Sequence, residues 1–264
     1  MGAIRAPAVA GTFYPAHPDR LRAAIGGYLA AGDTHDEPAP KAVIAPHAGY
    51  VYSGPVAGHA FASLGREASG VHRVVVIGPA HFVPIRGLAL PSADLFRTPL
   101  GDVPLDSQGI EAIRDLPQVR LADAPHRPEH ALEVELPFLQ TVLGEFGLVP
   151  LVVGDATPEE VAQVLDSLWD GPETLLVISS DLSHYEPYEG ARAHDVATAA
   201  AIERLDFARL GPRDACGWLP IAGLLIQARR RGMQAARLDL RNSGDTAGPK
   251  DQVVGYGAWA FQEP

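Results

Sequence analysis

Imidazole and carboxylate side chains follow several apolar segments of the chain, at the point where each segment ends. His47 comes after "AVIAP", His81 after "VVVIGPA", Asp181 and His184 after "LLVIS", and Asp245 after "ARLDLR". Fe(II), Zn and Cu accept such ligands, and two His with one carboxylate is typical of non-haem Fe(II). Without a metal, the same groups could supply a general base and its oriented partner. Asp181, three residues before His184, could fix the tautomer of that imidazole.

The apolar segments alternate with helical patterns, and this alternation predicts how the residues meet. The expected strands cover 41–46, 72–80, 86–91, 147–155, 173–181, 234–241 and 251–261. The expected helices cover 17–33, 54–65, 106–116, 131–144, 158–169, 189–205 and 219–232. This order predicts a three-layer α/β/α sandwich with a central mixed, largely parallel sheet.

Parallel strands bring their carboxyl ends to one edge of a sheet, where such folds bind their ligands. We therefore expect the His and Asp residues to converge in one crevice at that edge. No repeat and no linker divides the chain, so residues 1–264 are expected to form a single domain.

The composition excludes several classes of function. A net charge of −11 argues against nucleic-acid binding, because phosphate contacts need clustered Lys and Arg. The single cysteine excludes an intrachain disulfide and suits a reducing compartment. No apolar run approaches the roughly 18 residues of a membrane span. We expect a cytoplasmic protein with no membrane partner.

Several of the candidate residues also have a purely structural interpretation. Asp155, after "VPLVVG", could cap the helix that follows it. His130 and Glu133 are spaced to place two ligands on one helical face, or they simply begin a helix. Cys216 could be a thiolate stabilised at a helix start, or a small buried residue there.

Ordered blocks of the sequence resemble the Memo family, whose prokaryotic members are also called AmmeMemoRadiSam system protein B. The blocks are "RAPAVAGTFYP", "VIAPHAGYVYSGPVAGHAF", "VVVIGPAHF", "FRTPLGDVPLD", "EHALEVELPFLQ", "VISSDLSHY", "ACGWLPI" and "VVGYGAWAF". The resemblance runs from about residue 4 to residue 261. That family is similar in fold to the class III extradiol ring-cleavage dioxygenases, which implies one crevice holding a non-haem Fe(II).

The resemblance also implies a ligand set. The first two metal ligands fall on His47 and His81, and Fe(II) is the expected metal, with Zn or Cu as alternatives. Animal members carry a cysteine in the loop before the last strand, where this chain has Thr246. A threonine hydroxyl is a poor ligand for Fe(II) or Cu. We therefore expect the neighbouring Asp245 to supply the third ligand, with Asp181 or His184 as alternatives.

Residues around the metal are assigned on the same basis. The resemblance places the Asp-x-x-His pair of the pocket on Asp181 and His184, and a Glu-His pair on Glu129 and His130. We expect His130 or His184 to act as general base, with Asp181 as a catalytic partner. The residues expected to contact a substrate are Glu129, Tyr50 and Cys216.

Two functions are consistent with these residues. The first is an Fe(II)-dependent, dioxygenase-like oxidoreductase acting on a small molecule. The second is a non-catalytic module that binds a peptide or partner, since the family label implies radical-SAM and AMMECR-type protein partners. A zinc hydrolase built on the same histidines is a third and weaker hypothesis.

Overall fold

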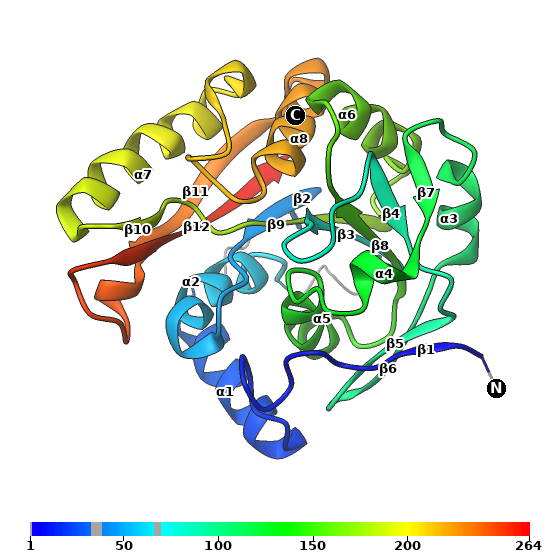
Figure 1. Cartoon of the computed structure of the whole chain (residues 1–264), viewed down its shortest axis with the longest axis horizontal. Coiled ribbons are helices and arrows are strands. Elements are labelled where there is room, and N and C mark those ends of the chain that lie inside the picture. Colours follow the sequence, from blue (N-terminus) through cyan, green and yellow to red (C-terminus); the bar gives the residue numbers. More distant parts are fainter. Residues whose placement is uncertain (1, 33–38, 66–69) are drawn as a thin grey trace.

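The structure, a computed structural model, describes residues 2–32, 39–65 and 70–264. A nine-stranded mixed sheet runs through its centre in the order β10-β12-β2-β9-β3-β8-β4-β7, with β11 paired to β12 (Figure 1). These strands are β2 (Ala42–Ala45), β3 (Arg73–Pro79), β4 (Leu88–Leu90), β7 (Val119–Leu121), β8 (Gly147–Val153), β9 (Thr174–Ser179), β10 (His184–Glu186), β11 (Gln234–Asn242) and β12 (Val253–Gln262). The four central strands β2, β9, β3 and β8 are parallel, whereas β12 and β4 flank them in the antiparallel direction.

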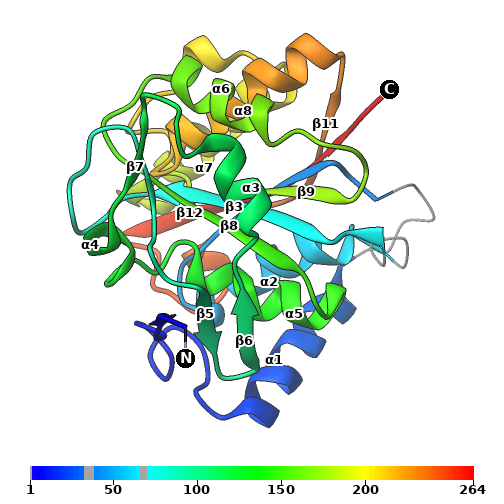
Figure 2. The ribbon, with the colours of Figure 1, turned by 90° about the vertical axis from the view of Figure 1, so that its right-hand side faces the viewer.

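Helices cover both faces of the sheet, which confirms the predicted three-layer α/β/α architecture (Figure 2). One face carries α1 (Pro18–Ala31), α2 (Tyr50–Ala62) and α5 (Leu136–Leu143). The other carries α3 (Ser107–Ile113), α6 (Pro158–Ser167), α7 (Tyr188–Glu203) and α8 (Trp218–Arg231). Within the described ranges, none of the helices is both long and apolar enough to cross a membrane.

Alternating side chains of the central strands fill two separate cores. In β3, Val75 and Ile77 pack with α6 and α8, while Val74 and Val76 pack with α2 and α5. Successive residues of a strand point to opposite faces, so a strand covered on both faces reads as a continuous apolar run. This is why the sequence predicted the central strands to within about two residues at their ends.

Short elements escaped prediction because they carry no long apolar pattern. They include a second sheet with the order β1-β5-β6, formed by β1 (Ile4–Arg5), β5 (Leu95–Thr98) and β6 (Gly101–Pro104). The others are β7, β10, α4 (Asp123–His126) and the 3-10 turns η2 (Glu133–Glu135), η3 (Phe207–Arg209) and η4 (Ser243–Asp245). Helix α2 begins at Tyr50 rather than near residue 54, and Pro55 lies within its first turns.

The N-terminal segment is tied to the molecule through one fully buried carboxylate. Glu133 accepts hydrogen bonds from the Arg5 guanidinium, the Tyr14 hydroxyl and the backbone N–H groups of Ala8 and Val9. Of the two interpretations of His130 and Glu133, the structure favours a helix start, because residues 133–135 form a 3-10 turn before α5 and the Glu133 side chain faces the N-terminal segment. The turn that carries it leads directly into α5.

Removing this carboxylate is expected to destabilise the protein strongly. Glu133→Ala would leave Arg5 buried without its counter-charge, which typically costs about 3–5 kcal/mol. The free energy of unfolding in urea measures the effect. Glu111→Ala, which removes only an exposed pair with Arg114, is the control and should change stability by less than about 0.5 kcal/mol. Equal effects of the two substitutions would contradict this account.

Candidate metal centre

Two histidines meet at the carboxyl edge of the sheet because their strands flank a common neighbour. His47 follows β2 and His81 follows β3, and β9 lies between these strands. Neighbouring strands are about 4.8 Å apart, so two side chains leaning over β9 can touch. The ring centroids of His47 and His81 are 5.1 Å apart, with the rings nearly perpendicular.

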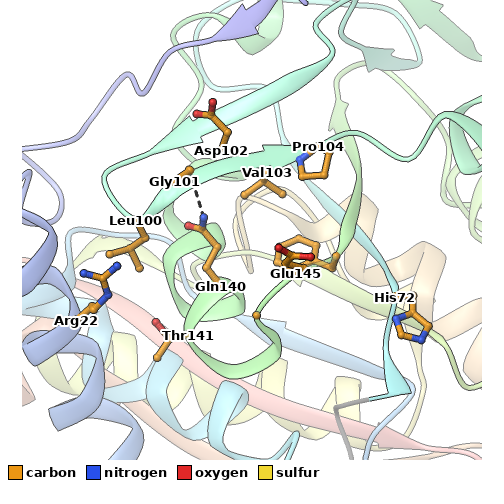
Figure 3. A pocket seen from close by; sticks show the side chains of 12 residues that line it. Arg22, His72, Leu100, Gly101, Asp102, Val103, Pro104, Gln140, Thr141 and Glu145 are labelled. Atoms are coloured by element: carbon orange, nitrogen blue, oxygen red, sulfur yellow. Dashed lines mark hydrogen bonds between the residues drawn. The ribbon is translucent and has the colours of Figure 1, made fainter.

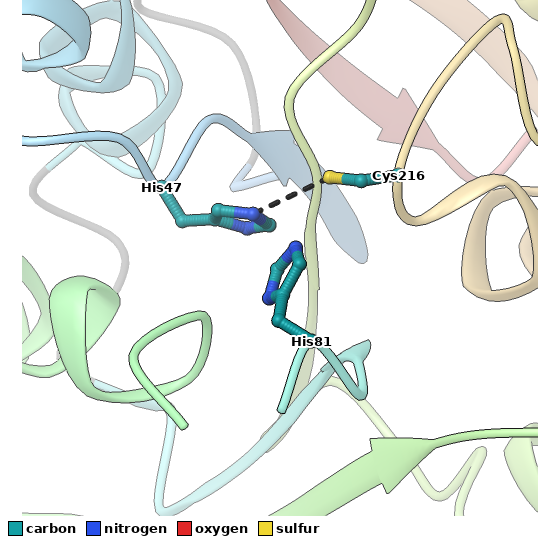
Figure 4. Close-up of side chains that lie close together, drawn as sticks. All are labelled: His47, His81 and Cys216. Atoms are coloured by element: carbon teal, nitrogen blue, oxygen red, sulfur yellow. Dashed lines mark hydrogen bonds between the residues drawn. The ribbon is translucent and has the colours of Figure 1, made fainter. Parts of the chain in front are cut away.

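Cys216 supplies a third donor to the same point. Its Sγ lies 3.4 Å from Nε2 of His47, and ligand atoms of His47, His81 and Cys216 all lie within 4.8 Å of one another. Figure 4 shows a nitrogen of the His81 ring pointing toward the gap between the other two side chains. The three groups therefore form a donor set of two nitrogens and one sulfur that leaves room for a further ligand, as catalytic metal sites do.

The loop before α8 can carry Cys216 to the edge because a glycine follows it. A Cβ on Gly217 would lie 2.7 Å from the Cβ of Ser180 and 2.8 Å from the Ser179 carbonyl oxygen, so only glycine fits. The Gly217 N–H donates to the Ser180 hydroxyl, and the Cys216 N–H donates to the Asp181 carbonyl. The end of β9 thus anchors the start of α8.

His47 is buried and presents one nitrogen to the donor set. Its Nδ1 lies 2.7 Å from the Ser179 hydroxyl oxygen, which leaves Nε2 facing Cys216. Burial, together with the nearby rings of His81, His130 and His184, holds the pKa of His47 well below its usual value. The imidazole is therefore neutral near pH 7, as metal ligation requires.

His81 is held from behind by a buried carboxylate. Glu129 accepts from both the backbone N–H and Nδ1 of His81, at 2.7 and 2.8 Å. Burial alone would raise the pKa of Glu129, but hydrogen bonds from His81 and Ala131 lower it below the usual value. A carboxylate behind a ligating imidazole fixes its tautomer and raises its basicity. Glu129 therefore orients His81 and does not face the substrate side as expected.

His130 lies against these two residues. Its ring stacks on His81 with a centroid distance of 4.8 Å, and its Nδ1 is 3.4 Å from the Glu129 carboxylate. Burial lowers the pKa of His130 to about 4. His81, Glu129 and His130 form a second group of donor atoms within 4.8 Å, which shares His81 with the first.

Asp181 and His184 are not paired across a turn. The Asp181 carboxylate turns back toward β2 and accepts from the His47 backbone N–H at 2.9 Å. His184 Nδ1 instead contacts the Leu182 carbonyl oxygen at 2.8 Å. Asp181 is thus a residue that positions the backbone of His47, and it does not fix the tautomer of His184.

The expected third ligand, Asp245, lies elsewhere. Strand β12 pairs with β2 at Trp259, but it pairs with the end of β11 at Gly255, four residues further out. The β11–β12 hairpin therefore extends well past the sheet edge and carries Asp245 with it. There the exposed carboxylate accepts from the Tyr188 hydroxyl and the Asn242 N–H. The third possible ligand atom beside His47 and His81 is Sγ of Cys216.

Two further expectations are corrected by the structure. Tyr50 is buried in the core between the sheet and α5, and its hydroxyl donates to the Val134 carbonyl, so it does not reach a substrate. Asp155 does not cap α6, because Thr157 and Glu160 form a reciprocal capping box there. Cys216, expected to contact a substrate, lines a small pocket at the sheet edge, and its Sγ is also one of the atoms that could bind a metal ion.

A small pocket opens beside the donor set. It has a volume of about 340 Å³ and lies among the loops that follow β3 and β8 and the start of α8. Its lining includes the two donors His81 and Cys216 together with Phe82, Ile85, Asp155, Trp218 and Leu219. Ligand pockets of this kind combine apolar walls with a few polar groups. His130 and His184 are not among its lining residues.

A larger cavity lies at the opposite edge of the sheet. It has a volume of about 940 Å³ and is bordered by β6, the end of α5 and residues that precede β3 and β8 (Figure 3). Arg22, His72, Asp102 and Glu145 are its charged or titratable lining residues. Neither group of clustered donor atoms includes any of them. The possible metal ligands His81 and Cys216 therefore border the smaller pocket and not the larger cavity.

Fold and site together define a three-layer α/β/α protein with a histidine–cysteine donor site at the carboxyl ends of its parallel strands. A family profile described as "Memo-like protein" matches residues 5–260, so the chain belongs to the Memo family. A MEMO1 family protein of Aeropyrum pernix is 38% identical over 280 residues, which cover 97% of this chain and 98% of the relative. Its counterpart in Sulfolobus acidocaldarius is 35% identical over 277 residues, covering 96% and 97%.

A solved structure supports the fold alone. The uncharacterized protein JW3007 from Escherichia coli K12 superposes with a TM-score of 0.51 at 15% sequence identity. The match covers 83% of this chain and 98% of that one.

The state of the thiol predicts a proton release on metal binding. Burial, with Asp181 close by, raises the pKa of Cys216 to about 12, so the thiol holds its proton at neutral pH. A metal binds the thiolate, and each bound ion is therefore expected to displace about one proton. Apparent affinity should then rise as the pH is raised.

Titrating the metal-free protein in a weakly buffered indicator solution measures this release. Cys216→Ser is the matched control, because a serine hydroxyl keeps its proton and the release should fall toward zero. Metal binding by the unsubstituted protein without any proton release would contradict the assignment of Cys216 as a ligand.

Proposed function

We propose that the chain binds a first-row transition metal through His47, His81 and Cys216 and acts as a metal-dependent oxidoreductase on a small molecule. The observation that carries the proposal is the convergence of two imidazole nitrogens and one sulfur from three separate loops. Membership of the Memo family supports it, because that family resembles the class III extradiol dioxygenases.

The donor set fits such a metal. His47 is neutral, and Glu129 holds His81 with its other nitrogen toward the gap. The negative charges of a Cys216 thiolate and of Glu129 would offset the charge of a divalent ion in this partly buried place. Imidazole suits iron, copper and zinc, while a thiolate adds preference for copper and zinc. We take Fe(II) as the first candidate on the family resemblance, with Cu and Zn as alternatives.

The residues around the metal would then have separate roles. A metal bound here supplies Lewis-acid and one-electron chemistry. The apolar walls of Phe82, Trp218 and Leu219 exclude water and hold the body of a small substrate. His130 stacks on His81 and is the first candidate base; burial lowers its pKa to about 4, so the ring is neutral near pH 7 but only weakly basic. His184 is the second candidate base, and its pKa is also lowered by burial.

Metal analysis of protein purified without oxygen tests the proposal. We expect one metal ion per chain, lost in His47→Ala, His81→Ala and Cys216→Ser. The loss of affinity should exceed the roughly 10- to 100-fold typical of residues that only support a ligand. Asp245→Ala is the control, because its carboxylate lies on the outer hairpin and should leave metal content unchanged. Absence of metal from the unsubstituted protein after reconstitution with Fe(II), Zn(II) and Cu(I) would refute the proposal.

Turnover is tested separately by oxygen consumption. Iron-loaded protein is expected to consume O₂ in the presence of catechol-like compounds that fit the small pocket. Filling that pocket with Leu219→Trp should abolish the uptake while leaving bound metal intact. O₂ uptake that persists in this variant would show that the substrate does not bind in the small pocket.

A second candidate function is a binding module, favoured by aromatic side chains that stand exposed around the donor set. Tyr52, Phe82 and Tyr185 are 39%, 56% and 70% exposed. Tyr52 lies in the first turn of α2, shortly after His47, while Phe82 and Tyr185 directly follow His81 and His184. Tyr185 also has a positive φ of 59°, a strained conformation for a non-glycine residue. Exposed aromatic groups clustered at one place favour protein or peptide contact.

Purified radical-SAM and AMMECR-type proteins are the partners to test for this second function. Binding that is lost in Phe82→Ala and Tyr185→Ala would favour a module over an enzyme. Oxygen consumption without any partner would favour the enzyme. In either case a reducing compartment such as the cytoplasm suits a site whose thiol must stay reduced.

A further inference from the structure

A second buried glutamate lies behind the other histidine, and neither the fold nor the proposed reaction uses it. Glu135 is fully buried, and its Oε1 is 2.9 Å from the hydroxyl oxygen of Ser179. Its other oxygen, Oε2, has no hydrogen-bond partner among the described residues. Ser179, also fully buried, is the residue that touches Nδ1 of His47.

The Ser179 hydroxyl has three neighbours but only one proton. Its oxygen lies 2.7 Å from the Ala131 carbonyl oxygen, 2.7 Å from His47 Nδ1 and 2.9 Å from Glu135 Oε1. The carbonyl can only accept, so it takes the serine proton. The serine oxygen must then accept from both remaining neighbours. This requires a proton on His47 Nδ1 and a proton on Glu135.

An ionised Glu135 would break this arrangement. It would compete with the Ala131 carbonyl for the single serine proton, and one of these two acceptors would be left without a hydrogen bond. It would also leave a charged oxygen buried with no partner, which is far more costly than burying a neutral carbonyl. Burial also favours the protonated form, because it raises the pKa of Glu135 well above its usual value.

We propose that Glu135 is a neutral carboxylic acid that, through the Ser179 hydroxyl, positions the His47 ring with Nδ1 protonated and Nε2 free to bind the metal. Glu135 and Ser179 are thus positioning residues, and the inference rests on the proposed role of His47 as a ligand. In the metal-free protein, Nε2 of this tautomer would accept a hydrogen bond from the Cys216 thiol, whose sulfur lies 3.4 Å away.

The two histidines are therefore supported in different ways. Glu129 accepts from His81 and from the backbone N–H groups of His130 and Ala131, which stabilises an ionised carboxylate. Among the described residues, the Glu135 carboxyl group contacts one hydroxyl and no N–H group. Both carboxyl groups belong to the short segment 129–135, which backs the whole site.

The first experiment needs no metal. Nitrogen NMR of the metal-free protein is expected to show His47 as the Nδ1–H tautomer, and Ser179→Ala should shift it toward Nε2–H. The infrared spectrum is expected to contain the carbonyl band of a protonated, buried carboxyl group that is missing in Glu135→Gln. An Nε2–H tautomer in the unsubstituted protein, or a spectrum unchanged by Glu135→Gln, would overturn the inference.

Metal affinity provides the second experiment, with Co(II) as a visible probe. Ser179→Ala and Glu135→Leu are expected to weaken binding by about 10- to 100-fold, as is typical for residues that orient a ligand. Glu135→Gln keeps an N–H donor for the serine oxygen and should restore most of this loss. The matched change Glu129→Gln removes a negative charge, so it should weaken Co(II) binding more than Glu135→Gln does.

The outcomes separate this inference from the proposed function. If the unsubstituted protein binds no metal, the proposed function fails, while the tautomer and the carboxyl band still decide the state of Glu135. If metal binds and Glu135→Gln is as damaging as Glu135→Leu, Glu135 acts as an ionised acceptor and the inference is wrong.

Discussion

The structure depends on keeping the His47 imidazole and the Cys216 thiol uncharged while they are packed beside His81 at the sheet edge. Ligand atoms of His47, His81 and Cys216 lie within 4.8 Å of one another, so protonated rings would repel strongly. Burial holds the pKa of His47 down and that of Cys216 up, which leaves both neutral without a metal. A divalent ion would bind the lone pairs of the two imidazole nitrogens and of the sulfur, and it would displace the thiol proton.

The short segment 129–135 provides most of the support for that arrangement. Its three glutamates are all buried, and each serves a different part of the molecule. Glu129 holds His81, Glu133 binds the N-terminal segment, and Glu135 reaches His47 through Ser179. One stretch of chain therefore connects the two ligand-bearing loops with the N-terminal segment, from the face of the sheet covered by α5.

The sequence predicted the layers and the position of His47 and His81, because buried parallel strands are continuous apolar runs and their ends share an edge. It named Cys216 as a substrate contact and not as a possible metal ligand, and the reason is physical. Cys216 does not follow a strand, and it reaches the edge only because Gly217 allows α8 to approach Ser180. Asp245 does follow a strand, but that strand continues past the edge. Tyr50 is close to His47 in sequence, yet helix α2 begins there and turns it into the core.

The central claim is that one sulfur and two imidazoles bind a single metal ion. X-ray absorption spectroscopy at the metal edge of the loaded protein tests it most directly. The account predicts one sulfur neighbour at about 2.3 Å, as for a zinc-bound thiolate, together with imidazole nitrogens, and loss of the sulfur signal in Cys216→Ser. A metal surrounded by oxygen and nitrogen alone in the unsubstituted protein would contradict it.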